Sequence, residues 1–288
     1  MILITGASGN VGGAVLKKVV ESGQPVSAMY RSDADARSAP PKVRAVIADF
    51  ADKNSLSRAF ENVDSLFLVC SPILQLVELE SNAIDIAGEK GIKHLVLSSS
   101  AGAGRWDKSF PKWHTEAEHA LKSSGLGHSI VRPNSFMQNI TAFFAGTIQT
   151  QDVFYSSMGQ SKASLVDVQD IADVVAALLT SEAQNAVYEL NGPEALTYSE
   201  VAERISKHSG RTIRYVDIPM AEQMKALLNT GMPDWQAQAL IDLQDYYLQG
   251  NGGELTDDIE RITGHSPRDL NQFLAASLSA FQRRAASA

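Results

Sequence analysis

Cysteine is almost absent from this chain: Cys70 is the only one among 288 residues. A single thiol excludes an intrachain disulfide and a metal site built on cysteines, and the six histidines are too scattered to indicate another metal centre. Long apolar runs are missing as well, because the best of them, residues 171–179, is interrupted by Asp173. That length is too short for a helix that spans a bilayer.

Basic residues are outnumbered, with 25 Lys and Arg against 33 Asp and Glu and a net charge of -8. Nucleic acids are bound by clustered Lys and Arg, so this balance argues against such a partner. The chain starts directly on a strand-like run without a leader-like segment. We therefore expect a soluble globular protein of the cytoplasm, without a membrane or nucleic-acid partner.

The strongest signal in the sequence is a glycine-rich turn near its start. An apolar run over residues 1–5 predicts a strand, and the pattern over residues 11–22 predicts a helix. Between them, glycines recur at every third position. This order presents backbone N–H groups and a positive helix end to an anion, which is typical of a dinucleotide diphosphate site. The residues predicted to form that site are Thr5, Gly6, Ser8, Gly9, Asn10, Val11 and Gly12.

Strand-like and helix-like segments then alternate through the first half of the chain. Alternation of this kind indicates repeated βαβ units. The predicted fold is therefore α/β, a Rossmann-type doubly wound parallel sheet with helices on both faces. The expected strands are residues 1–5, 26–30, 43–48, 65–70, 94–98 and 128–132, and the expected helices are 11–22, 55–60, 76–90 and 113–123.

The rhythm changes after about residue 145. Residues 149–161 look loop-rich. From Thr197 onward the sequence predicts mostly helices: Thr197 and Glu200 form a capping box that starts one helix, and further helices are expected over 233–247 and 267–283. We predict a Rossmann domain for NADP(H) over residues 1–150, to which residues 163–190 return. A smaller, mostly helical region over residues 191–288 would bind the substrate.

The end of the second strand indicates which dinucleotide is preferred. NAD sites usually place an acid there for the ribose 2′-OH, whereas this chain has Arg31, nineteen residues after Gly12. A guanidinium can pair with a 2′-phosphate, and Ser32 can add a hydroxyl donor. The alternative is a solvated surface arginine. The pattern favours NADP(H).

Other predicted cofactor contacts follow the carboxyl ends of later strands, where ligands bind in open α/β sheets. Asp49 either accepts a hydrogen bond from the adenine amine or caps the next turn, and Cys70 is read as a small buried filler rather than a nucleophile. The predicted contacts are Asp49 and Phe50; Cys70, Ser71 and Pro72; Ser98, Ser99 and Ser100; and Pro133, Asn134 and Phe136.

Several segments resemble the NmrA-like family, an atypical branch of the short-chain dehydrogenase/reductase superfamily that includes NADPH-dependent quinone oxidoreductases and triphenylmethane-dye reductases. The resemblance covers essentially the whole chain. It implies a Rossmann domain, a preference for NADP(H), and a small-molecule pocket roofed by the C-terminal region. The segments that carry it are the glycine turn, Arg31, and residues 95–100, 131–139 and 166–174.

The superfamily usually carries a tyrosine and a lysine four residues apart on the helix after the fifth strand. No tyrosine occurs between Tyr30 and Tyr155, so this pair is absent. The nearest substitute is His114 with Glu118, at i and i+4 on one helix. His114 would donate a proton or a hydrogen bond, and Glu118 would orient the ring or contact the nicotinamide ribose. The alternative is a structural pair on the surface.

The missing pair bears on the substrate. Interconversion of a plain alcohol and ketone needs a matched acid–base, whereas reduction of a quinone or a cationic dye does not. A conjugated small-molecule acceptor is therefore favoured, held by Trp106, Trp113, Phe136 and Met137. The alternative function is a redox sensor that binds NADP(H) without chemistry and signals to a protein partner. The sequence leaves the oligomeric state open.

Overall fold

The computed structural model describes residues 1–283 and divides the chain into two units. The first unit comprises Met1–Pro133, Val168–Leu190 and Asp258–His265. The second comprises Asn134–Asp167, Asn191–Asp257 and the chain from Ser266 onward. The chain therefore first passes from the first unit to the second after Pro133, where a strand ends, and not near residue 150. Among the described residues no helix is both long and apolar enough to cross a membrane.

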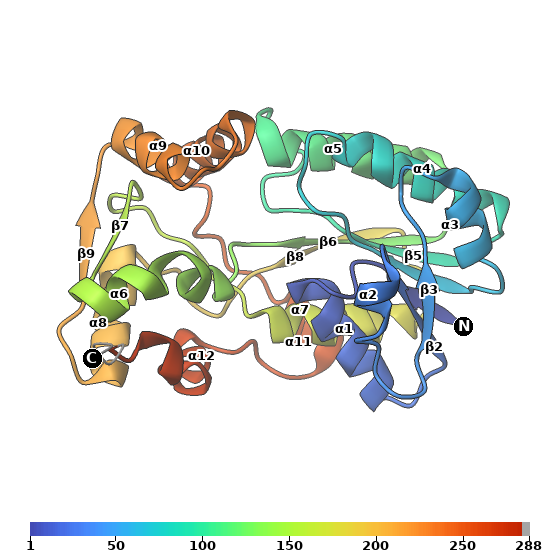
Figure 1. The fold of residues 1–288 in the computed structure, drawn as a ribbon, viewed down its shortest axis with the longest axis horizontal. Coiled ribbons are helices and arrows are strands. Elements are labelled where there is room, and N and C mark those ends of the chain that lie inside the picture. The colour runs from blue at the N-terminus through green and yellow to red at the C-terminus, as the bar shows by residue number, and fades with distance from the viewer. Residues whose placement is uncertain (284–288) are drawn as a thin grey trace. The chain divides into compact units, whose positions relative to one another are not determined.

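Seven parallel strands form the sheet of the first unit, in the order β3-β2-β1-β4-β5-β6-β8 (Figure 1). The order reverses between β1 and β4, which makes their carboxyl ends the switch point where doubly wound sheets bind ligands. The predicted α/β fold is thus confirmed. The strands are β1 (Ile2–Ile4), β2 (Val26–Tyr30), β3 (Arg44–Ile47), β4 (Ser65–Leu68), β5 (His94–Ser98), β6 (His128–Pro133) and β8 (Ala186–Leu190).

Helices cover both faces of this sheet. Figure 1 shows α3, α4 and α5 on one face and α1, α7 and α11 on the other. Because both faces are covered, the central strands are mainly apolar, and Leu3, Leu66 and Leu95 are completely buried. The helices are α1 (Asn10–Glu21), α2 (Asp33–Ala36), α3 (Lys53–Ala59), α4 (Leu76–Glu89), α5 (Ser109–Ser123), α7 (Val168–Leu179) and α11 (Asp258–Thr263).

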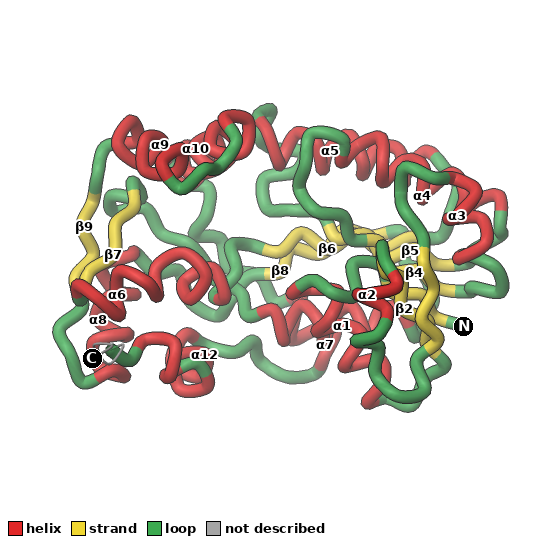
Figure 2. Tube along the Cα trace, viewed as in Figure 1, coloured by secondary structure: helices red, strands yellow, loops and turns green. Residues whose placement is uncertain are grey.

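The second unit is mostly helical, with one short parallel pair of strands (Figure 2). Phe144, Phe154, Tyr198 and Tyr215 pack ring against ring, and this aromatic cluster joins its helices to the strand pair. The elements are the π-helix η1 (Ile140–Phe144), α6 (Ala145–Gln151), β7 (Val153–Ser156), α8 (Tyr198–Ser209), β9 (Arg214–Asp217), α9 (Met220–Asn229), α10 (Asp234–Leu248), α12 (Leu270–Ala276) and the 3₁₀ turn η2 (Leu278–Phe281).

Two expectations about the second unit are wrong. Residues 149–161 are not mainly a loop, because they contain the end of α6 and all of β7. β7 pairs with β9, about sixty residues later, and such a partner leaves no local sequence pattern. The single helix expected over 267–283 is instead α12 followed by η2, with a break at Ser277.

Candidate functional site

The glycine turn after β1 is a backbone surface that side chains would obstruct. Gly6 has a φ of +58°, and a Cβ atom there would lie 2.8 Å from Cγ1 of Val69. A Cβ on Gly12 would lie 2.2 Å from the carbonyl oxygen of Gly6. Both positions therefore require glycine, the first for its conformation and both for the close approach of neighbouring atoms.

The N-terminus of α1 has no side-chain cap. Gly9 occupies the N-cap position, and no acidic residue lies in the first turn. Ser8, Gly9 and Asn10 are exposed, whereas Thr5 and Val11 are buried. The first N–H groups of the helix, with its positive dipole end, are thus open to an anion.

Thr5 has a structural role in this turn. Its hydroxyl oxygen donates to the carbonyl of Phe67 at 3.0 Å and accepts from the amide of Val69 at 2.9 Å. These bonds fix the end of β1 against the end of β4. The glycine turn and the residues that follow β4 are consequently held together at the switch point of the sheet.

Arg31 and Ser32 lie at the carboxyl end of β2, but only one of them is engaged. The Ser32 hydroxyl caps α2, accepting from the Asp35 amide at 3.2 Å and donating to the Asp35 carboxylate at 2.7 Å. Arg31 is exposed, and within residues 1–283 no carboxylate forms an ion pair with it. The guanidinium of Arg31 is therefore available to a ligand.

The turns after β3 and β4 are shaped by local contacts. A side-chain oxygen of Asp49 accepts from the Ala51 amide at 2.8 Å, so this residue closes its own turn. Phe50 is half-buried against the core of the first unit. Burial, followed by the nearby Glu80, raises the pKa of the Cys70 thiol to about 12. Cys70 is therefore not a nucleophile near neutral pH.

Ser71 and Pro72, which follow Cys70 after β4, are exposed.

Glu118 on α5 is the centre of a buried polar network. Its two oxygens accept from Nε and Nη2 of Arg132 at 2.7 and 2.6 Å, from the Ser99 hydroxyl at 2.7 Å and from Lys122 at 2.9 Å. Burial opposes the charge, but these donors outweigh it and lower the pKa of Glu118 to about 2. Arg132 also binds Glu189 of β8 at 3.1 Å.

His114 lies one turn before Glu118 and is 7% exposed, so the two residues do not form a surface pair. Its Nδ1 is buried without a hydrogen-bond partner among residues 1–283, and the oxygens of Glu118 are committed to other donors. Glu118 therefore does not orient the ring by a hydrogen bond, in contrast to the expectation. Burial lowers the pKa of His114 to about 4, although Glu118 acts in the opposite direction.

Of the remaining residues expected in the first unit, Ser98 and Ser99 are buried. Ser100 is half-buried, and its hydroxyl has no hydrogen-bond partner in the described chain. Trp106 is half-buried below the ammonium of Lys108, 5.1 Å from the ring centre. Trp113 is also half-buried and stacks edge-on against Phe110, with ring centres 5.4 Å apart.

Pro133 ends β6, and the residues expected after it belong to the second unit. The Asn134 amide donates to Asn191 and to the carbonyl of Gly252, and its oxygen accepts from the Tyr247 hydroxyl at 2.9 Å. Its side chain is thus engaged within the protein. Met137 is 1% exposed and part of the core, whereas Phe136 is half-buried.

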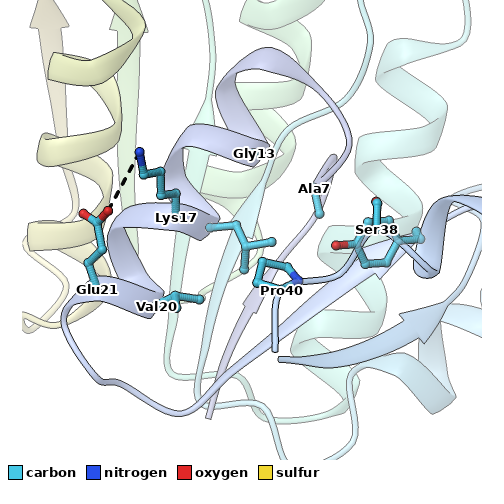
Figure 3. Close-up of a pocket in the computed structure, with 9 residues that line it drawn as sticks. Ala7, Gly13, Lys17, Val20, Glu21, Ser38 and Pro40 are labelled. Carbon is cyan, nitrogen blue, oxygen red and sulfur yellow. Dashed lines mark ion pairs between the residues drawn. The ribbon is translucent and has the colours of Figure 1, made fainter. Parts of the chain in front are cut away.

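Among the described residues, each unit contains a cavity. The first, of about 380 Å³, runs along α1 from Ala7 to the Lys17–Glu21 pair, opposite Ser38 and Pro40 (Figure 3). The second measures about 800 Å³. None of the four residues expected to hold the substrate lines either cavity. The second is lined by Gln160, Ser161, Lys162, Leu248, Gly250, Gly253 and Glu254.

The model of the NmrA-like family matches residues 1–276. The chain belongs to the NmrA-like family. An NAD(P)H azoreductase from Xenophilus azovorans is 31% identical over 288 residues, which cover 98% of this chain and 99% of the azoreductase. The resemblance stated from the sequence motifs is therefore confirmed.

Solved structures share the fold of this NmrA-like protein. An NADPH-dependent quinone oxidoreductase from Escherichia coli, crystallised with NADPH, has a TM-score of 0.89 at 26% identity, over 96% of this chain and 100% of that one. The triphenylmethane reductase of Citrobacter sp., in complex with NADP(H), has a TM-score of 0.87 at 22% identity, over 96% and 100% of the two chains. At that lower identity the second likeness shows the fold alone.

Two features of this NmrA-like protein were not predicted from the sequence. The first is Arg132, which binds Glu118. Its only signal in the sequence is that it is a basic residue within a strand that is otherwise buried. Asp170, Asp173 and His265 offer ligand atoms within 4.8 Å of one another, but the ammonium of Lys18 already binds Asp173 at 2.7 Å. The ammonium group of Lys18 thus supplies positive charge to the cluster of Asp170, Asp173 and His265.

Proposed function

We propose that this protein is an NADPH-dependent reductase that delivers hydride to a conjugated small molecule such as a quinone or an azo dye. One combination of features carries the proposal. The glycine turn at the end of β1 leads into a helix N-terminus without a side-chain cap, and Arg31 at the end of β2 has no carboxylate partner among residues 1–283. The first feature suits a diphosphate and the second a 2′-phosphate.

The residues present fit this cofactor. Gly6 and Gly12 keep side chains out of the turn, and the first turn of α1, which starts at Asn10 without a side-chain cap, offers N–H donors to the diphosphate. Arg31 would bind the 2′-phosphate, and since the Ser32 hydroxyl is bonded to Asp35, the preference for NADPH rests on Arg31. NADPH, when bound, supplies the hydride. Further contacts are proposed from Asp49, Phe50, Cys70, Ser71, Pro72, Ser98, Ser99, Ser100, Pro133, Asn134 and Phe136.

The acid–base groups of the first unit support a conjugated acceptor. Glu118 is ionised and bound by its donors, so it has no proton to give near neutral pH. His114 is neutral there because its pKa is about 4. A neutral imidazole can donate a hydrogen bond, but it does not protonate an alkoxide as the absent tyrosine–lysine pair would. Quinones and dyes delocalise the added electrons and do not need that proton in the same step.

The acceptor is proposed to bind among aromatic side chains. Trp106 and Trp113 each retain exposed surface, which they can offer to a flat conjugated ring. Phe136 in the second unit is also partly exposed, whereas Met137 can contribute only if the core around it rearranges.

Oxidation of NADPH by the purified protein tests this proposal, with a panel of quinones, azo dyes, simple ketones and aldehydes. We expect turnover with conjugated acceptors and none with the simple carbonyl compounds. Tight NADPH binding without turnover of any acceptor would contradict the proposal and favour a redox sensor. His114→Ala should retain most of the turnover of conjugated acceptors, since no proton transfer from this residue is required.

A further inference from the structure

Glu80 on α4 is a buried acid. None of its surface is exposed, and within residues 1–283 neither carboxyl oxygen has a hydrogen-bond partner. A charged carboxylate in such surroundings is strongly disfavoured, so the group retains its proton. Burial raises the pKa of Glu80 to about 8, and the nearby backbone amide of Cys70 offsets only part of this rise.

The carboxyl group of Glu80 lies near the backbone amide of Cys70, in the segment that follows β4. This segment also contacts the glycine turn. Glu80 is near enough to Cys70 that its ionised form would raise the pKa of the Cys70 thiol. The preceding residue, Val69, is the one whose side chain a Cβ on Gly6 would meet at 2.8 Å, and its amide is bonded to Thr5. Glu80 thus lies near Cys70, the residue that follows Val69 in the chain, and Val69 in turn packs against the glycine turn.

Charged groups around this position do not neutralise an ionised Glu80. Arg31 and Asp49 both act on Cys70, with opposite signs. On the neighbouring helices, the charges are paired elsewhere: Lys53 of α3 binds Asp85 at 3.0 Å, and Glu118 of α5 is held by Arg132. His114, also on α5, is neutral near pH 7, because its pKa is about 4.

We propose that Glu80 is a positioning residue for the cofactor, which supports the turn after β4 for NADPH binding only while it is protonated. This inference rests on the proposed NADPH site. The phosphates of NADPH would bring several negative charges to the glycine turn, against which Val69 packs, and a like charge nearby disfavours the ionised acid. By linkage, ionisation of Glu80 must weaken NADPH binding to the same extent.

Titration with NADPH from about pH 7 to about pH 9.5, above the range in which the 2′-phosphate takes up a proton, tests the inference on the full chain. We expect the Kd of the wild type to be constant below pH 8 and to rise by up to tenfold per pH unit above it. Glu80→Gln removes the ionisable group and should give a Kd that does not change across this range. Glu78→Gln, an exposed acid on the same helix, is the matched control and should behave as the wild type.

Proton uptake provides a second readout. Calorimetry of NADPH binding above pH 8, in buffers of different ionisation enthalpy, should show uptake of up to about one proton by the wild type and none by Glu80→Gln. Glu80→Met replaces the glutamine variant if that variant does not fold. Equal pH dependence in wild type and variant would overturn the inference and leave the NADPH site intact. Absence of NADPH binding at every pH would overturn the proposed function and this inference with it.

Discussion

Arg132 holds Glu118 through two parallel hydrogen bonds, with Nε and Nη2 at 2.7 and 2.6 Å from the two carboxylate oxygens. The pair joins β6 to α5, and Ser99 brings in the end of β5. A carboxylate that is 1% exposed and bound by three residues is structural. Glu118, which the sequence offered as part of a substitute for the tyrosine–lysine pair, instead links α5 to β6 and to the end of β5.

Glu118→Gln should therefore destabilise the first unit. The substitution leaves Arg132 buried with only Glu189 to balance its charge, and breaking a buried pair in this way costs about 3 kcal/mol. Chemical unfolding at pH 7 measures the change. The difference from wild type should shrink as pH falls from 4.5 towards 2, because the low pKa of Glu118 stabilises the fold only above that range.

Glu21→Gln is the control for this substitution. Glu21 forms an exposed pair with Lys17 on α1, at 4.0 Å, and its loss should change stability by less than about 0.5 kcal/mol. Equal effects of the two substitutions would show that the Arg132–Glu118 pair contributes no more than a surface contact.

His114→Gln should make the protein less sensitive to mild acid. The folded-state pKa of His114 is about 4, against 6.5 for the free side chain. The unfolded chain thus takes up a proton first, and the wild type loses up to about 1.4 kcal/mol of stability per pH unit as pH falls from 6.5 to 4. Unfolding free energies across this range should fall less steeply in the variant. His119→Gln, an exposed position on the same helix, should retain the wild-type slope.

Gly12→Ala should disrupt the glycine turn. The new Cβ would lie 2.2 Å from the Gly6 carbonyl, so the backbone must move, at a cost of about 2 kcal/mol or more. Thermal unfolding and NADPH titration should both report the loss. Gly88→Ala on α4 has open space around it and should raise stability by about 0.5–1 kcal/mol. A Gly12→Ala protein as stable as wild type would contradict the close approach of α1 to the turn.

The features that could be predicted from the sequence are those with local causes. The glycine turn and the capping box between Thr197 and Glu200 depend on residues close in sequence, and the local alternation of strand-like and helix-like segments indicates the parallel sheet. The structure contains each of them. The Arg132–Glu118 pair joins separate elements, so neither residue alone indicates the other. Glu80 did have a signal: it stands four residues after the buried Leu76, on the apolar face of α4.

Titration with NADPH and NADH, for the wild type and Arg31→Ala, tests the central claim most directly. We expect the wild type to bind NADPH more tightly, and Arg31→Ala to lose about ten- to hundredfold in NADPH affinity, because one charge-assisted contact to the 2′-phosphate is removed. NADH affinity should not change, and Arg58→Ala, an exposed arginine on α3, should match the wild type. Equal affinities of the wild type for NADPH and NADH, or a preference that survives Arg31→Ala, would contradict the account.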